Sequence, residues 1–495
     1  MTQSEDSSAS RGGLAKRPSS GLLPPAKTTT MGLNLPGRNT DPANKGYAIS
    51  FTHLGRRGYN LTLYAQTWVS RRKWVEHIES QQKLIRERSL IFAKVVVCEK
   101  YFLGSNKVNC SVAFGNKVTN IFLTVDGGRK LAYGTDNGIY VSDRKPHSNV
   151  KTTPIRVHPL ANVTQIDVLE EYGLLLVLCD KTLSSYPIEL LTDHDNATNF
   201  QMNRKAKKVS GHVNFFKSGV CLGRVFLCVV KSNSMNSTIK VLEPVEGLNR
   251  GRGRLGFARI LQSGQDFKVF KVNVSVFNSS QQEFYIPTES TSVHFLKSKL
   301  CVGCSKGFEI VDLENLETQS LLDPADTSLD FVTRREGTGA AKPIAIYRFN
   351  GLFLLCYDEF AFFVNKNGWR AKNDWMVSWE GMPTACGTLP APPFWKPLLM
   401  IAVQYPYLFA FEPSFVEIHS LETGALAQII PGSNIRLLAD GRGKLGEGGE
   451  ILFACESSLP GAAGGMDGEC QVNSLLKTGL DFMTSPRMIR HAEDD

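Results

Sequence analysis

Three short motifs in this 495-residue sequence have the residue types and the spacing of known chemical sites. GCSKG at 303–307 has the Gly-x-Ser-x-Gly spacing of a hydrolase nucleophile elbow, in which a strand and a helix present the serine oxygen. GRGRLG at 251–256 has the Gly-x-Gly-x-x-Gly spacing that accommodates a dinucleotide pyrophosphate. Cys301 and Cys304 have the C-x-x-C spacing of half a zinc site. Each site needs particular elements around it, so the neighbouring pattern decides whether the chemistry is available.

The pattern around each motif argues against all three kinds of chemistry. A strand pattern, not a helix, follows GCSKG, and the aligned GTDNG at 134–138 has the same two glycines in a turn. GRGRLG leads into another strand pattern, and no acidic residue stands at the spacing of a ribose-binding position. The C-x-x-C pair has no second pair, and the nine histidines form no H-x-E or H-E-x-x-H motif. We therefore expect no catalytic residue, cofactor or metal, and a binding protein rather than an enzyme.

The charge of the chain is unevenly distributed. The net charge is +9, and residues 46–92 hold eight Lys and Arg against three Glu. This excess predicts an anionic neighbour, either a membrane surface or an acidic protein. Nucleic acid is disfavoured, because no basic motif is interleaved with aromatic residues. The candidate anion- or membrane-binding residues are Arg56, Arg57, Arg71, Arg72, Lys73, Arg250, Arg252 and Arg254.

The cysteines and the apolar runs indicate a reducing compartment. Eleven cysteines are scattered through apolar runs, which favours buried free thiols over disulfides. The N-terminus has no apolar signal core, and Lys396, Pro397, Gln404 and Pro406 interrupt the longest apolar region, 394–411. We expect a cytoplasmic protein, either free or peripheral at the cytosolic face of the plasma membrane.

The two ends of the chain differ from the rest in composition. Residues 1–45 are rich in Ser, Thr, Pro and Gly without any period, and the segment from 458 is Gly-rich and then charged, so we predict disorder in both. Residues 47–67 predict two strands joined by a Gly-Arg-Arg-Gly turn. Residues 68–88 predict an amphipathic helix, because Trp74, Ile78 and Ile85 recur on one face.

From 94 to about 457 the sequence consists of short strand-like runs separated by Gly, Asn and Asp turns. Two runs align over a long stretch: LAYGTDNGIYVSD at 131–143 and LCVGCSKGFEIVDLE at 300–314. The same strand-turn-strand plan occurs seven times, once as the inner hairpin of a repeat at 351–365. Degenerate repeats made only of short strands are typical of propeller blades, so we predict an all-β, seven-bladed β-propeller over 94–457.

Four blocks within this region resemble the citron homology (CNH) domain at the C-terminal end of fungal Rho guanine-nucleotide exchange factors of the Rom type. The blocks are residues 108–143, 167–191, 363–387 and 405–424, and the resemblance covers roughly 94–440. The preceding YNLTLYAQTWVSRRKWVEHIESQQ resembles the last strand and the C-terminal helix of a pleckstrin homology (PH) domain. Trp74 has the place of that helix's signature tryptophan, so residues 46–92 are interpreted as the C-terminal part of a PH domain.

The resemblance implies a propeller that regulates or targets an exchange factor in cell-wall and polarity signalling. In such factors a catalytic Dbl homology domain and a complete PH domain precede the CNH domain, whereas this sequence contains neither a Dbl-type helical region nor the first PH strands. We therefore expect a non-catalytic interaction module that binds a Rho-type small GTPase or another part of the factor. The alternative is a peripheral membrane adaptor that uses the basic segment 56–88 and the basic loops.

The stretch GWRAKNDWMVSW, which follows the hairpin at 351–365, supplies the candidate contact residues. Aromatic and arginine side chains in connections are enriched among interface anchors. The candidate partner-binding residues are Trp369, Arg370, Trp375 and Trp379. The alternative for the tryptophans is packing between blades, which leaves Arg370 as the better surface candidate.

Overall fold

The computed structural model describes residues 29–30, 46–53, 55, 59–115, 129–144, 151–191, 206–245, 266–270, 283–333, 341–381, 401–442, 448–457 and 469–478. The chain divides into two compact units, Met1–Glu76 and His77–Asp495, and each is considered by itself.

The first unit contains a small antiparallel sheet of order β1-β2-β3. Its strands are β1 (Thr29–Thr30), β2 (Tyr47–His53) and β3 (Asn60–Ala65). The helix α1 (Trp68–Arg88) begins in this unit, where the Thr67 hydroxyl accepts a 3.0 Å hydrogen bond from the N–H of Ser70 and so caps the first turn. The predicted hairpin and helix are confirmed.

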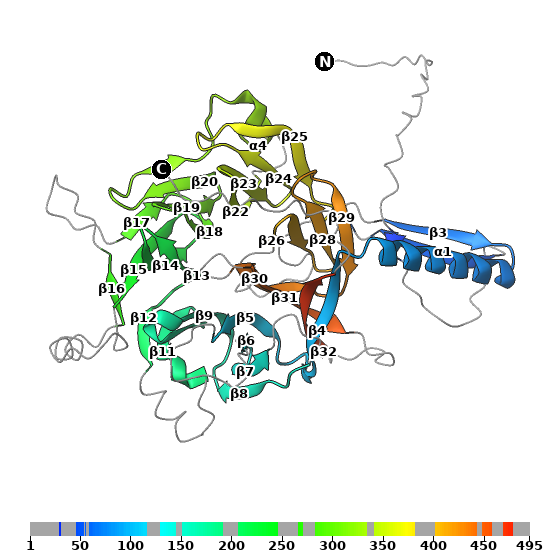
Figure 1. Cartoon of the computed structure of the whole chain (residues 1–495), viewed down its shortest axis with the longest axis horizontal. Helices are drawn as coiled ribbons and strands as arrows, with labels where there is room; N and C mark the ends of the chain where they lie inside the picture. The colour runs from blue at the N-terminus through cyan, green and yellow to red at the C-terminus, as the bar shows by residue number, and fades with distance from the viewer. Residues whose placement is uncertain are drawn as a thin grey trace, which may run out of the picture. The chain divides into compact units, whose positions relative to one another are not determined.

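The second unit contains a seven-bladed β-propeller, and Figure 1 shows its blades arranged around a common axis. In each of the first six blades the chain passes from the innermost strand outward. The first blade consists of β5 (Val108–Phe114), β6 (Arg129–Thr135), β7 (Ile139–Arg144) and β8 (Ile155–His158). The second consists of β9 (Val163–Leu169), β10 (Leu174–Cys179), β11 (Thr182–Pro187) and β12 (Lys207–Ser210). The third consists of β13 (Phe215–Cys221), β14 (Arg224–Ser232), β15 (Ser237–Pro244) and β16 (Phe267–Val269), and β17 (Glu283–Ile286) also pairs with β15.

The next three blades have four strands each in the described part of the chain. The fourth blade consists of β18 (Ser290–Phe295), β19 (Lys299–Cys304), β20 (Gly307–Asp312) and β21 (Thr318–Ser320). The fifth consists of β22 (Pro343–Phe349), β23 (Leu352–Tyr357), β24 (Phe360–Val364) and β25 (Arg370–Ser378). The sixth consists of β26 (Ile401–Gln404), β27 (Tyr407–Phe411), β28 (Phe415–Ser420) and β29 (Leu426–Pro431). The closing blade has the order β30 (Arg436–Arg442), β31 (Gly448–Ser457), β32 (Glu469–Lys477) and β4 (Phe92–Phe102). Short helical turns are η1 (Glu170–Tyr172), η2 (Ile188–Leu191), η3 (Thr327–Leu329) and α4 (Asp330–Thr333).

The hairpins that the sequence predicts are the two middle strands of the blades. Residues 131–143 lie in β6 and β7, and residues 300–314 lie largely in β19 and β20. GCSKG forms the end of β19 and the turn into β20, where Gly307 has a φ of 117°, so its serine belongs to a blade turn. The hairpin at 351–365 is also a middle pair, not an inner one, because β22 is the innermost strand of its blade.

The middle strands are apolar on both faces because each blade is packed between two neighbours. Leu175, Leu176 and Val177 on β10 are all buried, although successive side chains of a strand point to opposite faces. The core cluster that contains Leu175 and Val177 also contains Ala132 and Val141 of the first blade. Packing between blades therefore explains why these runs are continuously apolar rather than alternating.

The ten cysteines that the structure describes are free thiols, and nine of them are buried. Burial raises the pKa of Cys98 and that of Cys110 to about 12. At neutral pH these thiols are protonated and pack as small apolar groups. The prediction of buried free thiols is confirmed for this part of the chain.

The ring is closed by two strands from distant parts of the sequence. β4 pairs antiparallel with β32, with Cys98 opposite Val472 and Phe92 opposite Lys477. Phe92 is fully buried and makes edge contacts with Tyr407 and Phe409, at ring-centroid distances of 5.3 and 4.9 Å. The closing blade therefore holds its neighbour, the sixth blade, through aromatic packing as well as through the strand pairing.

The structure corrects the predicted propeller boundaries of 94 and 457. β4 begins at Phe92, and β32 (Glu469–Lys477) lies inside the segment predicted as a disordered tail from 458. The strand ECQVNSLLK mixes polar and apolar residues and follows a Gly-rich stretch, so its composition resembles that of a loop. Its stability comes from pairing with β31 and β4, which no local pattern reveals.

The side chain of Gln428 and the backbone just after β32 hold the start of β4, which follows α1 after the connection 89–91. The side-chain oxygen of Gln428 on β29 accepts hydrogen bonds from the N–H groups of Ile91 and Phe92, at 2.9 and 2.8 Å. The Gln428 amide nitrogen donates to the carbonyl of Phe92 at 2.8 Å. The N–H of Thr478 donates to the carbonyl of Ile91 at 2.8 Å. The first backbone groups of the closing strand thus have fixed partners.

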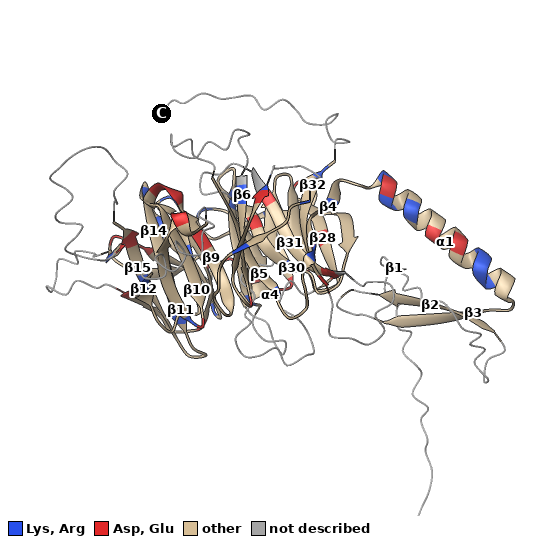
Figure 2. Ribbon diagram, turned by 90° about the horizontal axis from the view of Figure 1, so that it is seen from below, with Lys and Arg blue, Asp and Glu red and all other residues tan. Residues whose placement is uncertain are grey.

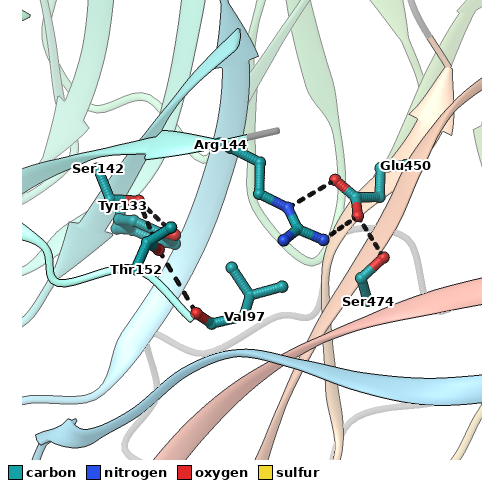
Figure 3. A network of polar contacts seen from close by, with 7 residues as sticks. All are labelled: Val97, Tyr133, Ser142, Arg144, Thr152, Glu450 and Ser474. Carbon is teal, nitrogen blue, oxygen red and sulfur yellow. Dashed lines mark hydrogen bonds and ion pairs between the residues drawn. The ribbon is translucent and has the colours of Figure 1, made fainter. Parts of the chain in front are cut away.

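Figure 3 shows a buried ion pair between the first blade and the closing blade. The Arg144 guanidinium donates to the two carboxylate oxygens of Glu450, at 3.2 and 2.5 Å. The two side chains are 1% and 8% exposed. The Ser474 hydroxyl donates to Glu450 at 2.6 Å. The charge pair is therefore desolvated but supplied with hydrogen bonds, the condition under which a buried pair is tolerated.

A second set of polar contacts in Figure 3 joins the first blade to β4. The hydroxyls of Tyr133 and Ser142 lie 3.0 Å apart, and that of Thr152 donates to Ser142 at 3.2 Å. The N–H of Thr152 donates to the carbonyl of Val97 at 2.9 Å. Thr152 thereby occupies part of the outer edge of β4, which limits the edge available for pairing with other chains.

Replacing Arg144 by Ala should lower the free energy of unfolding by about 3–5 kcal/mol, because Glu450 would remain as a buried charge without its partner. Lys130→Ala is the control, since Lys130 forms a 3.6 Å ion pair with the exposed Asp143 and should cost about 0–1 kcal/mol. Urea unfolding followed by circular dichroism measures both. Equal losses in the two variants would show that the buried pair does not stabilise the ring closure.

Candidate partner-binding edge of the fifth blade

Trp369 and Arg370 lie where the chain passes from β24 to the outermost strand β25. The indole of Trp369 is 43% exposed, yet its Nε1–H donates a 2.9 Å hydrogen bond to the carboxylate of Asp323. The side-chain oxygen of Asn365 accepts hydrogen bonds from the N–H groups of Asn367 and Trp369, at 2.9 and 3.1 Å. The tryptophan is therefore presented to solvent on a fixed turn.

The segment 321–333 packs against this turn. The Asp326 carboxylate accepts from the N–H of Ser328 at 3.0 Å, which caps η3, and from the N–H of Arg370 at 2.7 Å. The N–H of Asp323 donates to the carbonyl of Gly368 at 3.3 Å. Gly368 has a φ of 81°, and a Cβ added there would lie 2.0 Å from the Leu321 carbonyl oxygen. Only glycine permits this close approach.

The Arg370 side chain is half-buried and is positioned by this segment. Its guanidinium carbon lies 5.0 Å from the ring centroid of Phe331, a distance suited to a cation–π interaction. The guanidinium also donates to the carbonyls of Ser328 and Asn373, at 3.4 and 3.1 Å. We name the group Asp323, Asp326, Phe331, Trp369 and Arg370 the blade-five edge.

Two carboxylates offset the positive charge of the blade-five edge. Burial opposes ionisation of Asp326, but hydrogen bonds from Ser328 and from the N–H of Arg370 hold its pKa below the ordinary value. Asp326 is therefore charged at neutral pH, and it holds the backbone of Arg370 while Asp323 holds the indole of Trp369. The two carboxylates fix the positions of the two candidate contact residues.

The structure buries the other two predicted contact residues. Trp375 and Trp379 are each 4% exposed, so they pack within the protein and do not form a surface. Trp375 lies 4.5 Å from Phe363 between ring centroids, and the Nε1–H of Trp379 donates to the carbonyl of Tyr357 at 2.9 Å. Packing, the alternative considered for the tryptophans, is therefore correct for these two, and the prediction of partner contact is wrong for them.

Three of the predicted anion-binding residues lie on α1, where Figure 2 shows basic and acidic side chains interspersed. The Nε of Arg71 donates to the carbonyl of Ala48 at 2.7 Å, so this residue supports the fold of the first unit. Arg72 pairs with Glu76 at 2.7 Å. Lys73 is exposed. The remaining predicted residues, Arg56, Arg57, Arg250, Arg252 and Arg254, lie outside the described part of the chain.

Within the described ranges, no group of His, Cys, Asp or Glu is arranged to hold a metal ion. Among the same residues, no helix is long and apolar enough to cross a membrane. The described surface presents a tryptophan and an arginine that are held in fixed positions at the edge of a rigid ring. Such a pair is suited to recognition of another macromolecule.

Comparison with known proteins identifies the family. Residues 127–441 match the CNH domain family, and residues 1–82 match a pleckstrin homology domain family. This chain belongs to the CNH domain family. The pleckstrin homology match begins at residue 1, whereas the composition of residues 1–45 predicted disorder and only residues 46–92 resembled part of that domain.

The relatives of this chain include fungal exchange factors. The chain is 50% identical over 420 residues to the Rho1 guanine nucleotide exchange factor 1 of Schizosaccharomyces pombe, covering 84% of this chain and 28% of that protein. It is 35% identical over 409 residues to the RHO1 GDP-GTP exchange protein 2 of Saccharomyces cerevisiae, covering 80% of this chain and 26% of that protein. The solved AfRom2 CNH domain is similar with a TM-score of 0.57 and 44% identity, over 77% of this chain and 98% of that one. The predicted family and the propeller fold are confirmed.

Asp326→Asn should loosen the segment 321–333, and its effect should depend on pH. A carboxylate whose pKa is lowered by folding stabilises the folded state above its unfolded pKa of about 3.9, and this contribution is lost as the pH falls through the folded value. The stability difference from the unmodified protein should thus be largest at neutral pH and shrink in acid. Hydrogen exchange of residues 321–333 over this pH range measures it, with the exposed Asp374→Asn as control. A difference that stays constant with pH would contradict the proposed role of the charge.

Proposed function

We propose that this chain is a non-catalytic docking module of a Rho guanine-nucleotide exchange factor, and that the blade-five edge binds a Rho-type small GTPase. The observation that carries the proposal is the exposed Trp369, whose indole is fixed by Asp323 beside the half-buried Arg370. A rigid aromatic side chain loses little conformational entropy on binding, and tryptophan and arginine are the side chains most enriched among interface anchors.

Two further observations support the proposal. The relatives' names describe exchange on Rho1, so a Rho-type GTPase is a partner of the proteins that this chain resembles. The propeller also supplies a rigid scaffold, because its blades are packed through apolar faces on both sides. Contact residues on connections held by such a scaffold are positioned before the partner arrives.

A specific observation favours a second function, the binding of an anionic membrane by α1. Trp68, Val69 and Trp74 are each more than half exposed, and Arg72 and Lys73 lie among them. Exposed tryptophan beside basic side chains on a helix is suited to the interface between lipid headgroups and acyl chains. Because Arg72 is already paired with Glu76, the basic character of this surface is moderate, and we place this function second.

Titration of the full chain against a Rho-type GTPase tests the first function. We expect saturable binding in at least one of the GDP, GTP-analogue and nucleotide-free forms, without faster nucleotide release. Replacing Trp369 and Arg370 together by Ala should weaken the affinity about thirtyfold, equivalent to about 2 kcal/mol. Met376→Ala is the matched control, because Met376 is 43% exposed like Trp369 and lies on β25, the strand that begins at Arg370.

Three outcomes would count against this function in different ways. Unchanged affinity in the double variant would remove the blade-five edge as the contact surface. The absence of binding to every nucleotide form would remove the GTPase as the partner and leave another part of the exchange factor. Accelerated nucleotide release would show that the module is catalytic.

Sedimentation with vesicles that contain phosphatidylserine tests the second function. Each basic residue near an anionic surface contributes about 1 kcal/mol, so Arg72→Gln with Lys73→Gln should weaken binding by about twentyfold or more. The control is Arg86→Gln with Arg88→Gln, which removes the same charge from the last turn of α1. Equal loss in both double variants would mean that net charge, and not the surface around Trp68 and Trp74, determines vesicle binding.

A further inference from the structure

The innermost strands of four consecutive blades end in turns with accessible apolar side chains, and the first three of these turns are also basic. These turns follow β13, β18, β22 and β26, and they contain the sequences VCLGR, FLKSK, RFNGL and QYPY. We name seven of their residues the inner rim: Val220, Leu222, Phe295, Lys297, Arg348, Phe349 and Tyr405.

Two contacts at the turns themselves, and one contact at the starts of β18 and β22, place the four turns in a row. The Thr291 hydroxyl at the start of β18 donates to the carbonyl of Pro343 at the start of β22, at 3.0 Å, so these strands begin side by side. The rings of Phe349 and Tyr405, at the far ends of β22 and β26, have centroids 6.3 Å apart. In the other direction, the N–H of Leu222 donates to the carbonyl of Lys297 at 2.8 Å. The inner rim thus follows the ends of four innermost strands that lie next to one another in consecutive blades.

Apolar side chains of the inner rim are unusually accessible for residues next to the core. Tyr405 is 58% exposed and Val220 is 46% exposed, and Leu222, Phe295 and Phe349 are half-buried. Each of these residues stands at the end of a strand whose preceding residues are largely buried, so its backbone is firmly positioned. An accessible row of apolar side chains on a firm backbone is the composition of an interaction surface.

The charge of the inner rim is positive only. The four turns contain Arg224, Lys297, Lys299 and Arg348 and no acidic residue. Arg224 is paired with Glu243 at 2.9 Å, and Lys299 is paired with Asp312 at 3.1 Å. Lys297 and Arg348 are exposed, and neither forms an ion pair with another described residue. Among the described residues these two cations thus have no ion-pair partner, and they would favour a binding partner of opposite charge.

We propose that the inner rim binds a short extended protein segment that carries acidic residues interspersed with aromatic or aliphatic ones. The apolar side chains of the segment contact Val220, Phe349 and Tyr405, and its carboxylates pair with Lys297 and Arg348. Charge complementarity selects an acidic segment, and the apolar row selects a peptide over a free anion, which would need only the cations. The turn that carries Trp369 joins β24 to β25, so it lies on the same face of the fifth blade but further from the axis. The two surfaces are separate.

Fluorescence anisotropy tests this proposal with the full chain and a short synthetic peptide in which Glu alternates with Phe and Leu. We expect saturable binding of this peptide that weakens in high salt, and much weaker binding of the matched peptide with Gln in place of Glu. Lys297→Glu with Arg348→Glu should reduce the affinity by about tenfold or more. The control is Lys306→Glu with Lys342→Glu, which makes the same charge change in the same two blades, at the ends opposite to the inner rim.

A further variant separates the apolar contribution from the charge. Tyr405→Ser removes a well-exposed aromatic side chain of the inner rim without changing its charge, and it should also weaken binding of the acidic peptide. Equal binding of the Glu and Gln peptides, or equal loss in the rim and control double variants, would overturn the proposal. So would the absence of peptide binding together with rim-dependent binding to phosphatidylserine vesicles, which would assign the surface to lipid. The Rho-type GTPase titration uses Trp369 and Arg370, so the two proposals can fail independently.

Discussion

The fold depends on the pairing of β4 with β32, because this pairing is what makes the ring continuous. A blade has two apolar faces, and each face is covered only when both neighbouring blades are present. Without β4, the closing blade loses its outer strand and Phe92 loses its place against Tyr407 and Phe409. The buried pair of Arg144 and Glu450 then fixes the first blade to the closing one. Strand pairing, aromatic packing and one charge pair together close the ring.

Local patterns predicted the elements well where burial acts on both faces of a strand. The middle hairpins of the blades were found because their apolar runs are strong and are bounded by turns. The helix at 68–88 was found from its period, although none of its residues is buried. The innermost strands were harder to recognise because one face meets the polar side chains near the axis, as in VTQIDVL of β9. β32 was missed for a related reason, because it is stabilised by pairing with β4, which lies far away in the sequence.

The candidate site was only partly predictable. Residue type and position in a connection led to Trp369 and Arg370, and the structure places both at the blade-five edge. The same reasoning also selected Trp375 and Trp379, which are core residues, because residue type does not report burial. Asp323 and Asp326 were not considered, since each lies more than forty residues before the group it holds, and only the packing of 321–333 on the turn brings them together.

The segment that matches the family model is shorter than the segment that forms the closed ring, because β4 lies outside the match. The family match spans residues 127–441, but the ring also needs β4 and β5 before that span and all of β31 and β32 after it. A protein cut at the limits of the match would expose the faces that Phe92, Phe102 and Val472 normally cover. Only residues 89–91 separate α1 from β4, and Gln428 holds Ile91 and Phe92 at the start of β4. A domain boundary that keeps the whole ring must therefore lie immediately after the helix. Recombination or truncation between α1 and β4 could therefore occur at very few positions without opening the propeller.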